Sequence, residues 1–414
     1  MEEIRKEEGK FTLKQTIKEK VLAQIDLSKE LYDSEIMELI DDIILDATKG
    51  QYMGVKEKLE LGKEVFNSLR RLDILQELLE DESITEIMIN GSKDIFIEEG
   101  GRLHKWAKEF ESRIKLEDIV QQMVSKSNRI INESNPIVDA RLEDGSRVNI
   151  VLPPIALNGP IVTIRKFPKE AITMERLIEL GSISMEVAEF LRKLVMAGYN
   201  IFISGGTGSG KTTFLNVLSN YIPNTERIIT IEDSAELQIK NLPNLVRLEV
   251  RNANVEGSNE VTIRDLIKTS LRMRPDRIVV GEVRDAAAID MLQALNTGHD
   301  GSMSTGHANS PIDMLHRLET LVLLGADIPL LAVRKQIASA IDIIVHLGRL
   351  RDRSRRVLEI VEVLDCEDSE IEINKLYVFR EESQDAEGNI IGGLYKTTNE
   401  LIQIHKLSKA GIAL

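Results

Sequence analysis

The sequence predicts an α/β protein whose largest domain is built on a doubly wound, mainly parallel β-sheet. From about residue 170 onward, short apolar segments alternate with helical patterns, as expected when crossover helices join parallel strands. Within this region, the apolar run 200–204 leads through a glycine-rich turn into a helical pattern that ends at Pro223. Upstream, residues 71–167 mix strand and helix patterns in another order, which indicates a separate, small α+β domain.

The elements of the large domain follow from their hydrophobic periodicity. Strands are predicted at residues 201–204, 227–232, 245–250, 277–281 and 302–306. Helices are predicted between and after them, at residues 211–221, 261–273, 285–297, 312–324 and 329–341. The section from 342 to 379 returns to a strand pattern, with an Arg-rich turn at 349–356. We expect this domain to span residues 168–414, including a C-terminal extension of helices and strands.

The first 167 residues divide into two parts. Residues 1–70 carry Leu and Ile at helical spacing among many Lys and Glu, which predicts two or three amphipathic helices. This segment is either a helical arm without a specific role or a docking module. In the domain at 71–167, Gly100-Gly101 is a hairpin turn, helices are predicted at 72–79 and 116–128, and strands at 84–90, 94–98, 138–142, 147–151 and 161–167. Pro168-Lys169 is the predicted linker to the large domain.

Composition and charge limit the partners that this chain is expected to bind. The formal net charge is −15, and an acidic chain is poorly suited to non-specific nucleic-acid binding, which relies on Lys and Arg contacts to phosphates. One cysteine, Cys366, allows neither a disulfide nor a four-cysteine zinc site within one chain. The charged N-terminal segment indicates no signal peptide, and no apolar run reaches the length of a membrane span. We therefore expect a cytoplasmic protein that binds no nucleic acid and contacts membranes only through partners.

The octapeptide at residues 205–212, GGTGSGKT, fits the pattern Gly-x-x-x-x-Gly-Lys-[Ser/Thr] of phosphate-binding loops. Backbone N–H groups of such a loop and the N-terminus of the following helix favour a polyphosphate. Lys211 is expected to reach the β- and γ-phosphates, and Thr212 to bind Mg²⁺ through its hydroxyl. The predicted nucleotide-binding residues of this segment are Gly205, Gly206, Thr207, Gly208, Ser209, Gly210, Lys211, Thr212 and Thr213.

Acidic residues and a histidine follow the ends of other predicted strands. Glu282 is expected on the strand adjacent to the phosphate loop, where it would orient the attacking water and bind magnesium through water. The preceding position, where phosphate-loop enzymes commonly carry an Asp, holds Gly281. His307 would sense the γ-phosphate or shape the nucleotide site, with an ordinary structural histidine as the alternative. A second acidic group ends the strand at 227–232 and is expected to share the water shell of the magnesium ion: Glu232, Asp233 and Glu236.

Six segments carry a more specific signal than the phosphate loop alone. They are DARLEDGSRVN at 139–149, GPIVTIRKF at 159–167, GGTGSGKTTFLN at 205–216, TIEDSAELQ at 230–238, SLRMRPDRIVVGEVR at 270–284 and LNTGHDGSMSTGHANSP at 295–311. In this order they resemble the secretion ATPase superfamily of type II and type IV secretion, and most closely its CpaF-like, tight-adherence pilus branch. The resemblance covers residues 70–414 well and residues 1–70 loosely. It implies a RecA-like ATPase domain after a small PAS-like domain, with ATP and Mg²⁺ as cofactors.

The resemblance also implies roles for individual residues. Glu282 is the catalytic glutamate, His307 belongs to the histidine box, and the acids at 232–236 form the aspartate box. Arg141 and Arg147 match arginines that the small domain brings toward the γ-phosphate, whereas their pattern alone indicates solvent-facing hairpin arginines. An arginine suits this role because its planar, always charged group stabilises the phosphoryl transition state.

Two features depart from the family pattern or leave alternatives open. Gly306 stands in the histidine box where a larger apolar residue is expected, which affects the setting of His307. The Arg-rich turn at 349–356 is interpreted as a solvated hairpin, with contact to a neighbouring subunit or a membrane-embedded partner as the alternative. The single cysteine excludes the four-cysteine metal element of the type II secretion branch.

The function that the resemblance implies is that of a homohexameric motor at the cytoplasmic face of the inner membrane. Such a motor hydrolyses ATP and passes displacement to a platform protein that adds or removes pilin subunits. The alternatives are an ATPase of another type IV secretion branch, a small-molecule phosphotransferase, a nucleotide-binding scaffold without activity, and a nucleic-acid translocase. No acceptor pocket marks a phosphotransferase, the intact catalytic candidates disfavour a scaffold, and the acidic charge disfavours a translocase.

Overall fold

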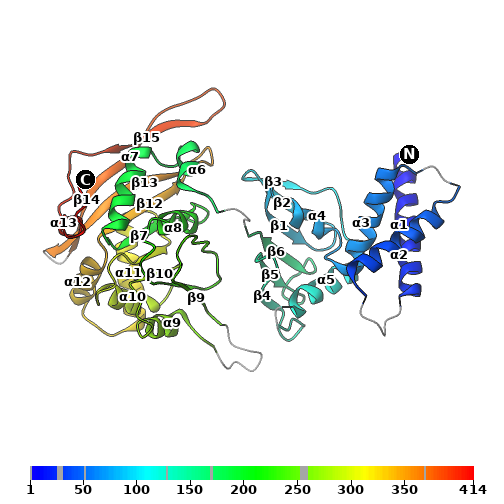
Figure 1. Ribbon diagram of the computed structural model, residues 1–414, viewed down its shortest axis with the longest axis horizontal. Coiled ribbons are helices and arrows are strands. Elements are labelled where there is room, and N and C mark those ends of the chain that lie inside the picture. Colours follow the sequence, from blue (N-terminus) through cyan, green and yellow to red (C-terminus); the bar gives the residue numbers. More distant parts are fainter. Residues whose placement is uncertain are drawn as a thin grey trace. The chain divides into compact units, whose positions relative to one another are not determined.

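The computed structural model describes residues 2–25, 31–50, 53–126, 129–167, 171–251, 260–367 and 370–414. The chain divides into two compact units, residues 1–169 and 170–414, and each has apolar cores of its own (Figure 1). The predicted linker Pro168-Lys169 lies outside the described residues. No helix in the described part of the chain is both long and apolar enough to cross a membrane.

The first unit begins with helices that pack around a separate apolar core. This core includes Val21 of the first helix, Ile40 of the second and Leu61 of the third, all of which are fully buried. In the second helix the buried residues Ile36, Ile40, Ile43 and Ile44 recur at helical spacing, as predicted for an amphipathic helix. Their bounds are α1 (Glu2–Gln24), α2 (Asp33–Ala47) and α3 (Val55–Arg70).

The rest of the first unit is an antiparallel sheet covered by two helices, as predicted for a small α+β domain. Within the described residues the strand order is β3-β2-β1-β6-β5-β4. Ser112 caps the helix that follows β3, because its side chain accepts a hydrogen bond from Lys115 N. The elements are α4 (Leu75–Glu80), β1 (Ile84–Asn90), β2 (Ile95–Glu99), β3 (Arg102–Lys105), α5 (Arg113–Ser125), β4 (Ile137–Arg141), β5 (Arg147–Val151) and β6 (Ile161–Arg165).

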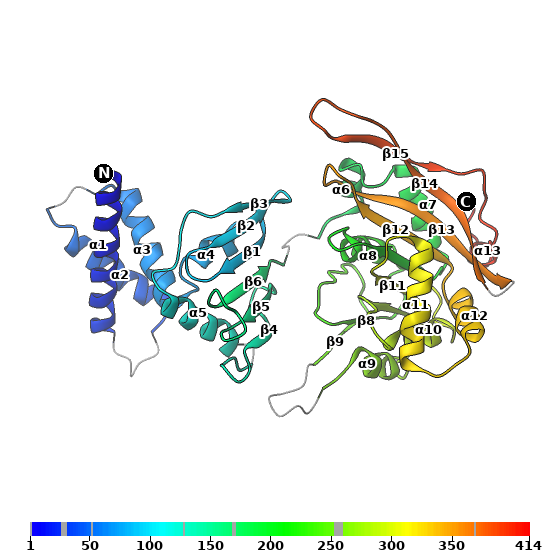
Figure 2. The ribbon, with the colours of Figure 1, turned by 180° about the vertical axis from the view of Figure 1, so that it is seen from behind.

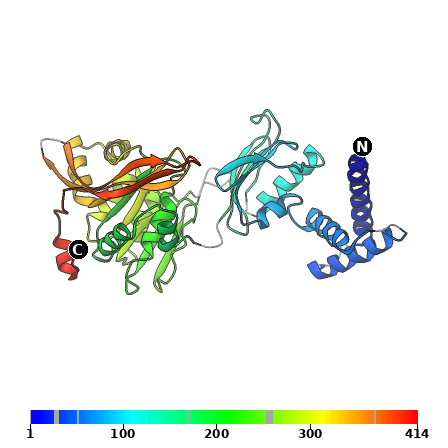
Figure 3. The same cartoon turned by 90° about the horizontal axis from the view of Figure 1, so that it is seen from above.

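The second unit contains a mixed sheet with the order β15-β14-β13-β12-β7-β11-β10-β8-β9 within the described residues. The strands from β12 to β9 in this order run parallel, and β13, β14 and β15 extend the sheet in antiparallel fashion. The extension forms the orange and red strands of Figure 3. The strands are β7 (Ile201–Gly205), β8 (Ile228–Glu232), β9 (Leu245–Glu249), β10 (Arg277–Val280), β11 (Met303–Gly306), β12 (Ile343–Arg349), β13 (Arg355–Glu367), β14 (Glu370–Gln384) and β15 (Ile390–Lys396).

Helices cover both faces of this sheet, which confirms the doubly wound prediction (Figure 2). Successive residues of β7 alternate between the two apolar cores: Ile201 and Ile203 pack with α7 and α8, and Phe202 packs with α10 and α11. The helices are α6 (Met174–Glu179), α7 (Met185–Met196), α8 (Lys211–Ser219), α9 (Ile263–Ser270), α10 (Ala287–Leu295), α11 (Pro311–Gly325), α12 (Leu330–Ala340) and α13 (His405–Ala410).

The strand order corrects one expectation. Glu282 follows β10, and β11 lies between β10 and the phosphate-loop strand β7. The expectation that Glu282 follows the strand adjacent to the loop is therefore wrong, because the order of strands in a sheet is set by how the crossover helices pack. The residue that follows β11, next to the loop strand, is His307. Both side chains still reach the same edge of the sheet, as parallel strands require.

Candidate functional site

The predicted phosphate loop connects β7 to α8 at the edge where the parallel strands end. Gly208 and Gly210 have φ angles of 72° and 94°, a left-handed conformation that residues with side chains rarely adopt. A Cβ atom at Gly205 would meet the carbonyl oxygen of Leu347 on β12. Ser209 Oγ donates to Gly206 O at 2.9 Å and helps to close the turn. The loop therefore has the backbone and the helix N-terminus that suit a bound polyphosphate.

Lys211 lies at the first turn of α8 with only 6% of its surface exposed. Its ammonium group donates to Gly206 O at 2.9 Å, and Nζ lies 3.2 Å from Nδ1 of His307. The lysine is thus folded back over the loop, and its contacts with a carbonyl and an imidazole can be exchanged for contacts with phosphate oxygens. The structure therefore brings Lys211 and His307 into contact.

Glu282 completes a cluster with His307 and Arg284. Its Oε1 lies 3.1 Å from His307 Nε2, and its Oε2 accepts a hydrogen bond from Arg284 Nη2 at 2.7 Å. Arg284 Nη1 also lies 3.6 Å from Asp233 Oδ2. Arg284 is not among the residues predicted from the sequence, although its place two residues after the candidate base was a usable signal.

The electrostatics of the cluster set the charges of its members. Burial would raise the pKa of the Glu282 carboxyl, but the hydrogen bond and charge of Arg284, with His307 and Lys211, outweigh burial and lower that pKa. Burial, followed by the Lys211 charge, lowers the pKa of His307, and Glu282 opposes them. At neutral pH the site therefore holds a charged glutamate beside a neutral imidazole.

Glu232 is turned into the interior, with 3% of its surface exposed. Its Oε1 accepts hydrogen bonds from the N–H groups of Glu236 and Leu237, both at 2.8 Å, and so closes the turn after β8. Burial raises the pKa of Glu232, against these two hydrogen bonds. A Cβ atom at Gly281 would lie 3.1 Å from Glu232 Cγ, so any side chain at position 281 would have to displace Glu232 slightly. Asp233 and Glu236 are less buried than Glu232.

The glycine of the histidine box is explained by its neighbours. A Cβ atom at Gly306 would lie 2.9 Å from Sδ of Met314 and 3.0 Å from a ring carbon of Phe202. These two side chains fill the volume that a larger residue at 306 would need. His307 nevertheless faces Lys211 and Glu282, so the departure from the family pattern leaves the position of this histidine intact.

Arg141 and Arg147 lie opposite each other on β4 and β5, in the first unit. Nε of Arg141 donates to Gly145 O at 3.1 Å, and its guanidinium lies over the ring of Phe167. Both arginines are half-buried, unlike freely solvated hairpin residues. The structure brings the two arginines together, and their role toward a nucleotide remains a proposal.

The Arg-rich turn joins β12 and β13 as a hairpin with mostly exposed arginines, as interpreted from the sequence, but two of its arginines also contact backbone outside the turn. Nε of Arg355, the first residue of β13, donates to Gly208 O of the phosphate loop at 2.9 Å. Arg356 Nη1 donates to Gly181 O at 2.7 Å. Arg351 is exposed and forms an ion pair with Glu381. The antiparallel extension therefore contacts the nucleotide edge directly, which the pattern of a local turn does not indicate.

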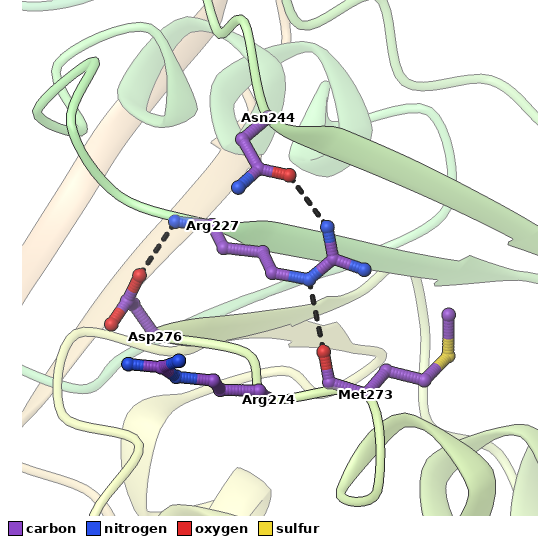
Figure 4. Close-up of a pocket in the computed structure, with 5 residues that line it drawn as sticks. All are labelled: Arg227, Asn244, Met273, Arg274 and Asp276. Carbon is purple, nitrogen blue, oxygen red and sulfur yellow. Dashed lines mark hydrogen bonds between the residues drawn. The ribbon is translucent and has the colours of Figure 1, made fainter.

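A hollow of about 400 Å³ lies at the other edge of the sheet, where β8 and β10 begin. Arg227 crosses it, and its side chain donates to Met273 O at 2.9 Å and to Asn244 Oδ1 at 2.6 Å (Figure 4). Its backbone N–H donates to Asp276 Oδ2 at 2.6 Å. Through these hydrogen bonds Arg227 connects the start of β8 to Asn244 and to the segment that leads into β10, on the side of the sheet away from the phosphate loop. We therefore interpret the hollow as structural.

The donors at the loop fit a magnesium ion that is held mainly by phosphates and water. Thr212 supplies a hydroxyl in the first turn of α8, and Glu282 supplies a charged carboxylate. In the described part of the chain, no group of three or more His, Cys, Asp or Glu side chains gathers to hold a metal. Mg²⁺ commonly takes one or two protein oxygens together with substrate phosphates and water, and Thr212 and Glu282 could supply them.

The fold and the site define a phosphate-loop α/β protein with a carboxylate and a histidine at the mouth of the loop. Residues 69–388 match the model of a family described as type II/IV secretion system protein, and the chain belongs to this family.

Known relatives agree with this assignment. The chain is 32% identical over 325 residues to the type IV secretion system protein VirB11 of Bartonella quintana, covering 69% of this chain and 90% of that protein. It is 34% identical over 289 residues to the conjugal transfer protein TrbB of Rhizobium radiobacter, covering 69% and 85%. The fold is similar to that of the ATPase DotB of Yersinia pseudotuberculosis, with a TM-score of 0.52, 20% identity and coverage of 70% and 78%.

Proposed function

We propose that this protein is an ATP-hydrolysing motor that works as a homohexamer at the cytoplasmic face of the inner membrane. The observation that carries the proposal is the cluster of Lys211, His307 and Glu282 at the mouth of the phosphate loop. Its groups have the charges that phosphoryl transfer to water requires: a cation for the phosphates and a carboxylate for the water.

In the proposed reaction, Lys211 leaves Gly206 O and binds the β- and γ-phosphates of ATP. Glu282 accepts a hydrogen bond from the attacking water and orients it, which its lowered pKa supports because the carboxylate stays charged. His307 stays neutral and donates or accepts a hydrogen bond near the γ-phosphate. Bound Mg²⁺ neutralises phosphate charge, and Thr212 with Glu282, acting through water, would hold it.

Arg141 and Arg147 of the first unit are the proposed arginines that stabilise the transition-state charge. Their nucleotide contacts would exist in the closed state alone, so ATP would favour closure of the two units and release of products would favour opening. The acids of the aspartate box have different proposed roles. Glu232 shapes the turn after β8, while Asp233 and Glu236 stay near the magnesium water shell.

The proposed cargo system is a tight-adherence pilus, with an inner-membrane platform protein as the partner of the hexamer. The similarity to a VirB11 protein and to a conjugal transfer protein supports a second candidate, the ATPase of another type IV secretion branch. A phosphotransferase, the alternative from another class, would need an acceptor for the phosphoryl group. Binding of nucleic acid is not part of the proposal.

The test is hydrolysis of Mg·ATP by the purified full chain without an acceptor or DNA, with ADP binding measured by calorimetry. We expect turnover by the parent protein and its loss in Lys211→Ala, with nucleotide affinity about 10- to 100-fold weaker, the range for losing a charge-assisted hydrogen bond. Lys240→Ala removes an exposed lysine of the same unit and should change neither quantity.

Absence of nucleotide binding by the parent protein would overturn the proposal. Turnover that appears only when an acceptor is added would favour the phosphotransferase. Sizing the protein with and without a non-hydrolysable ATP analogue tests the hexamer separately.

A further inference from the structure

The phosphate loop is flanked differently on its two sides. On one side, β11 and β10 end at His307 and Glu282, the groups expected at the γ-phosphate. On the other side lie β12 and β13, which Figure 1 shows beyond β7. On that side Arg355 holds Gly208 O through Nε at 2.9 Å, and its Cδ is the atom nearest to a Cβ placed on Gly210, at 3.7 Å.

A triphosphate in this loop has only one orientation consistent with the hydrolytic groups. Its γ-phosphate must lie toward Glu282, His307 and Lys211, because the attacking water is oriented there. The phosphate chain then runs across the loop, and the nucleoside leaves it on the opposite side. That side is the one from which Arg355 approaches.

The guanidinium of Arg355 is well placed to bind a flat, polar group. Its side chain is exposed, and the hydrogen bond from Nε to Gly208 O orients the planar guanidinium group. An arginine has five N–H donors, so the two terminal amino groups can serve a ligand while Nε stays bound to the loop. The same planar group stacks on aromatic faces, which suits a purine base.

Other arginines of the same hairpin are directed elsewhere. Arg351 forms an ion pair with Glu381 on β14, and Arg356 donates to Gly181 O and lies over the ring of Phe379. Arg351 therefore offers a matched control: it belongs to the same turn, carries the same charge and contacts a partner away from the loop.

We propose that Arg355 binds the nucleoside of the nucleotide, through its ribose oxygens or its base. This inference rests on the proposed nucleotide binding and adds a residue from the antiparallel extension to the site. Because the nucleoside is common to ATP and ADP, Arg355 contributes equally to the affinity for substrate and product. It therefore sets how tightly ADP is retained after hydrolysis.

The experiment compares ADP with magnesium tripolyphosphate, which has phosphates but no nucleoside. Affinities for both are measured by calorimetry on the full chain for the parent protein, Arg355→Ala, Arg355→Lys and Arg351→Ala. We expect Arg355→Ala to weaken ADP binding about 10-fold, the lower end for a charge-assisted hydrogen bond at an exposed site. Tripolyphosphate binding should be unchanged, Arg355→Lys intermediate for ADP, and Arg351→Ala like the parent.

Two results would overturn the proposal. If ADP and tripolyphosphate weaken by the same factor in Arg355→Ala, the arginine only supports the loop. If neither weakens, it contributes nothing to binding. Failure of the parent protein to bind ADP is a different outcome, because it removes the proposed function together with this inference, whereas ADP binding that is insensitive to Arg355 removes the inference alone.

Discussion

Charged side chains gather both where the parallel strands of the large sheet end and where they begin, but they do different things in the two places. At the edge with the phosphate loop, Lys211, Glu282 and His307 contact one another, and the last two are partly exposed. At the opposite edge, Arg277 is 2% exposed and is bound to Glu226 and to the carbonyl oxygens of Val195 and Gly301.

The difference lies in whether a contact can be exchanged. Arg277 has protein partners fixed by the start of β10 and by backbone carbonyls, and no ligand could replace them without opening the core. Lys211 and Glu282 have partners that a polyphosphate and a water molecule could replace. A charge whose partners are fixed by the fold serves the structure, whereas a charge whose partners a ligand can replace is suited to chemistry.

The largest expected effect is at the loop edge, with Glu282→Gln. Removing the carboxylate that orients water should lower kcat by about 10²- to 10⁴-fold while ADP affinity and unfolding stay close to the parent values. Steady-state hydrolysis and calorimetry measure the two quantities. Glu189→Gln, which alters an exposed glutamate paired with Arg192, is the matched control. Hydrolysis by Glu282→Gln at the parent rate would show that the role of this residue is wrong.

The next effect is at the opposite edge, with Arg277→Ala. This change leaves Glu226 and two backbone carbonyl oxygens without their donor, and we expect about 3–5 kcal/mol less free energy of unfolding. Urea unfolding measures this loss, and the ADP affinity of the folded fraction should stay unchanged. Arg272→Ala removes an exposed arginine nearby and should have little effect. A normal unfolding midpoint together with weaker ADP binding in Arg277→Ala would contradict the comparison.

The smallest expected effect is the pH dependence of stability and of kcat/KM that His307 causes at the phosphate loop. Its pKa is lowered, so the folded protein binds fewer protons here than the unfolded chain, and its contribution to stability decreases as pH falls through 6.5, the ordinary value. A histidine of ordinary pKa would be about half protonated at pH 6.5. Because the pKa of His307 is lowered, we expect kcat/KM at pH 6.5 to stay above about half of its value at pH 7.5.

The pH profile of His307→Asn is the control for this prediction, because it should lack the acid limb that belongs to the histidine. A parent profile whose apparent pKa lies at or above 6.5 would show that the imidazole is protonated more easily than its surroundings indicate.

Most of the fold follows from local pattern, because apolar periodicity and glycine placement are local properties of the chain. The strands of the parallel sheet and the helices α8 to α12 are confirmed within a few residues. The helices within 174–196 were not predicted, although Thr173 and Ser184 cap them through their side chains. The order of the strands was not predicted either, since pairing between distant segments leaves little trace in one sequence.

The site was predictable in its residue types and less so in their arrangement. The loop motif and the family segments identified Lys211, Glu282 and His307, which the structure brings together. The contact of Arg355 with Gly208 depends on the antiparallel extension folding back beside the loop, and no local pattern indicates it. The inward position of Glu232, where it accepts hydrogen bonds from the N–H groups of Glu236 and Leu237, is likewise not indicated by the sequence pattern.

The contact between Glu232 and Gly281 restricts which substitutions this chain can accept. A side chain at 281 would begin 3.1 Å from Glu232 Cγ, so Glu232 would have to shift by a few tenths of an ångström to make room for it. Such a shift would move the carboxylate whose Oε1 accepts hydrogen bonds from the N–H groups of Glu236 and Leu237. The space at position 281 and the turn after β8 are therefore coupled.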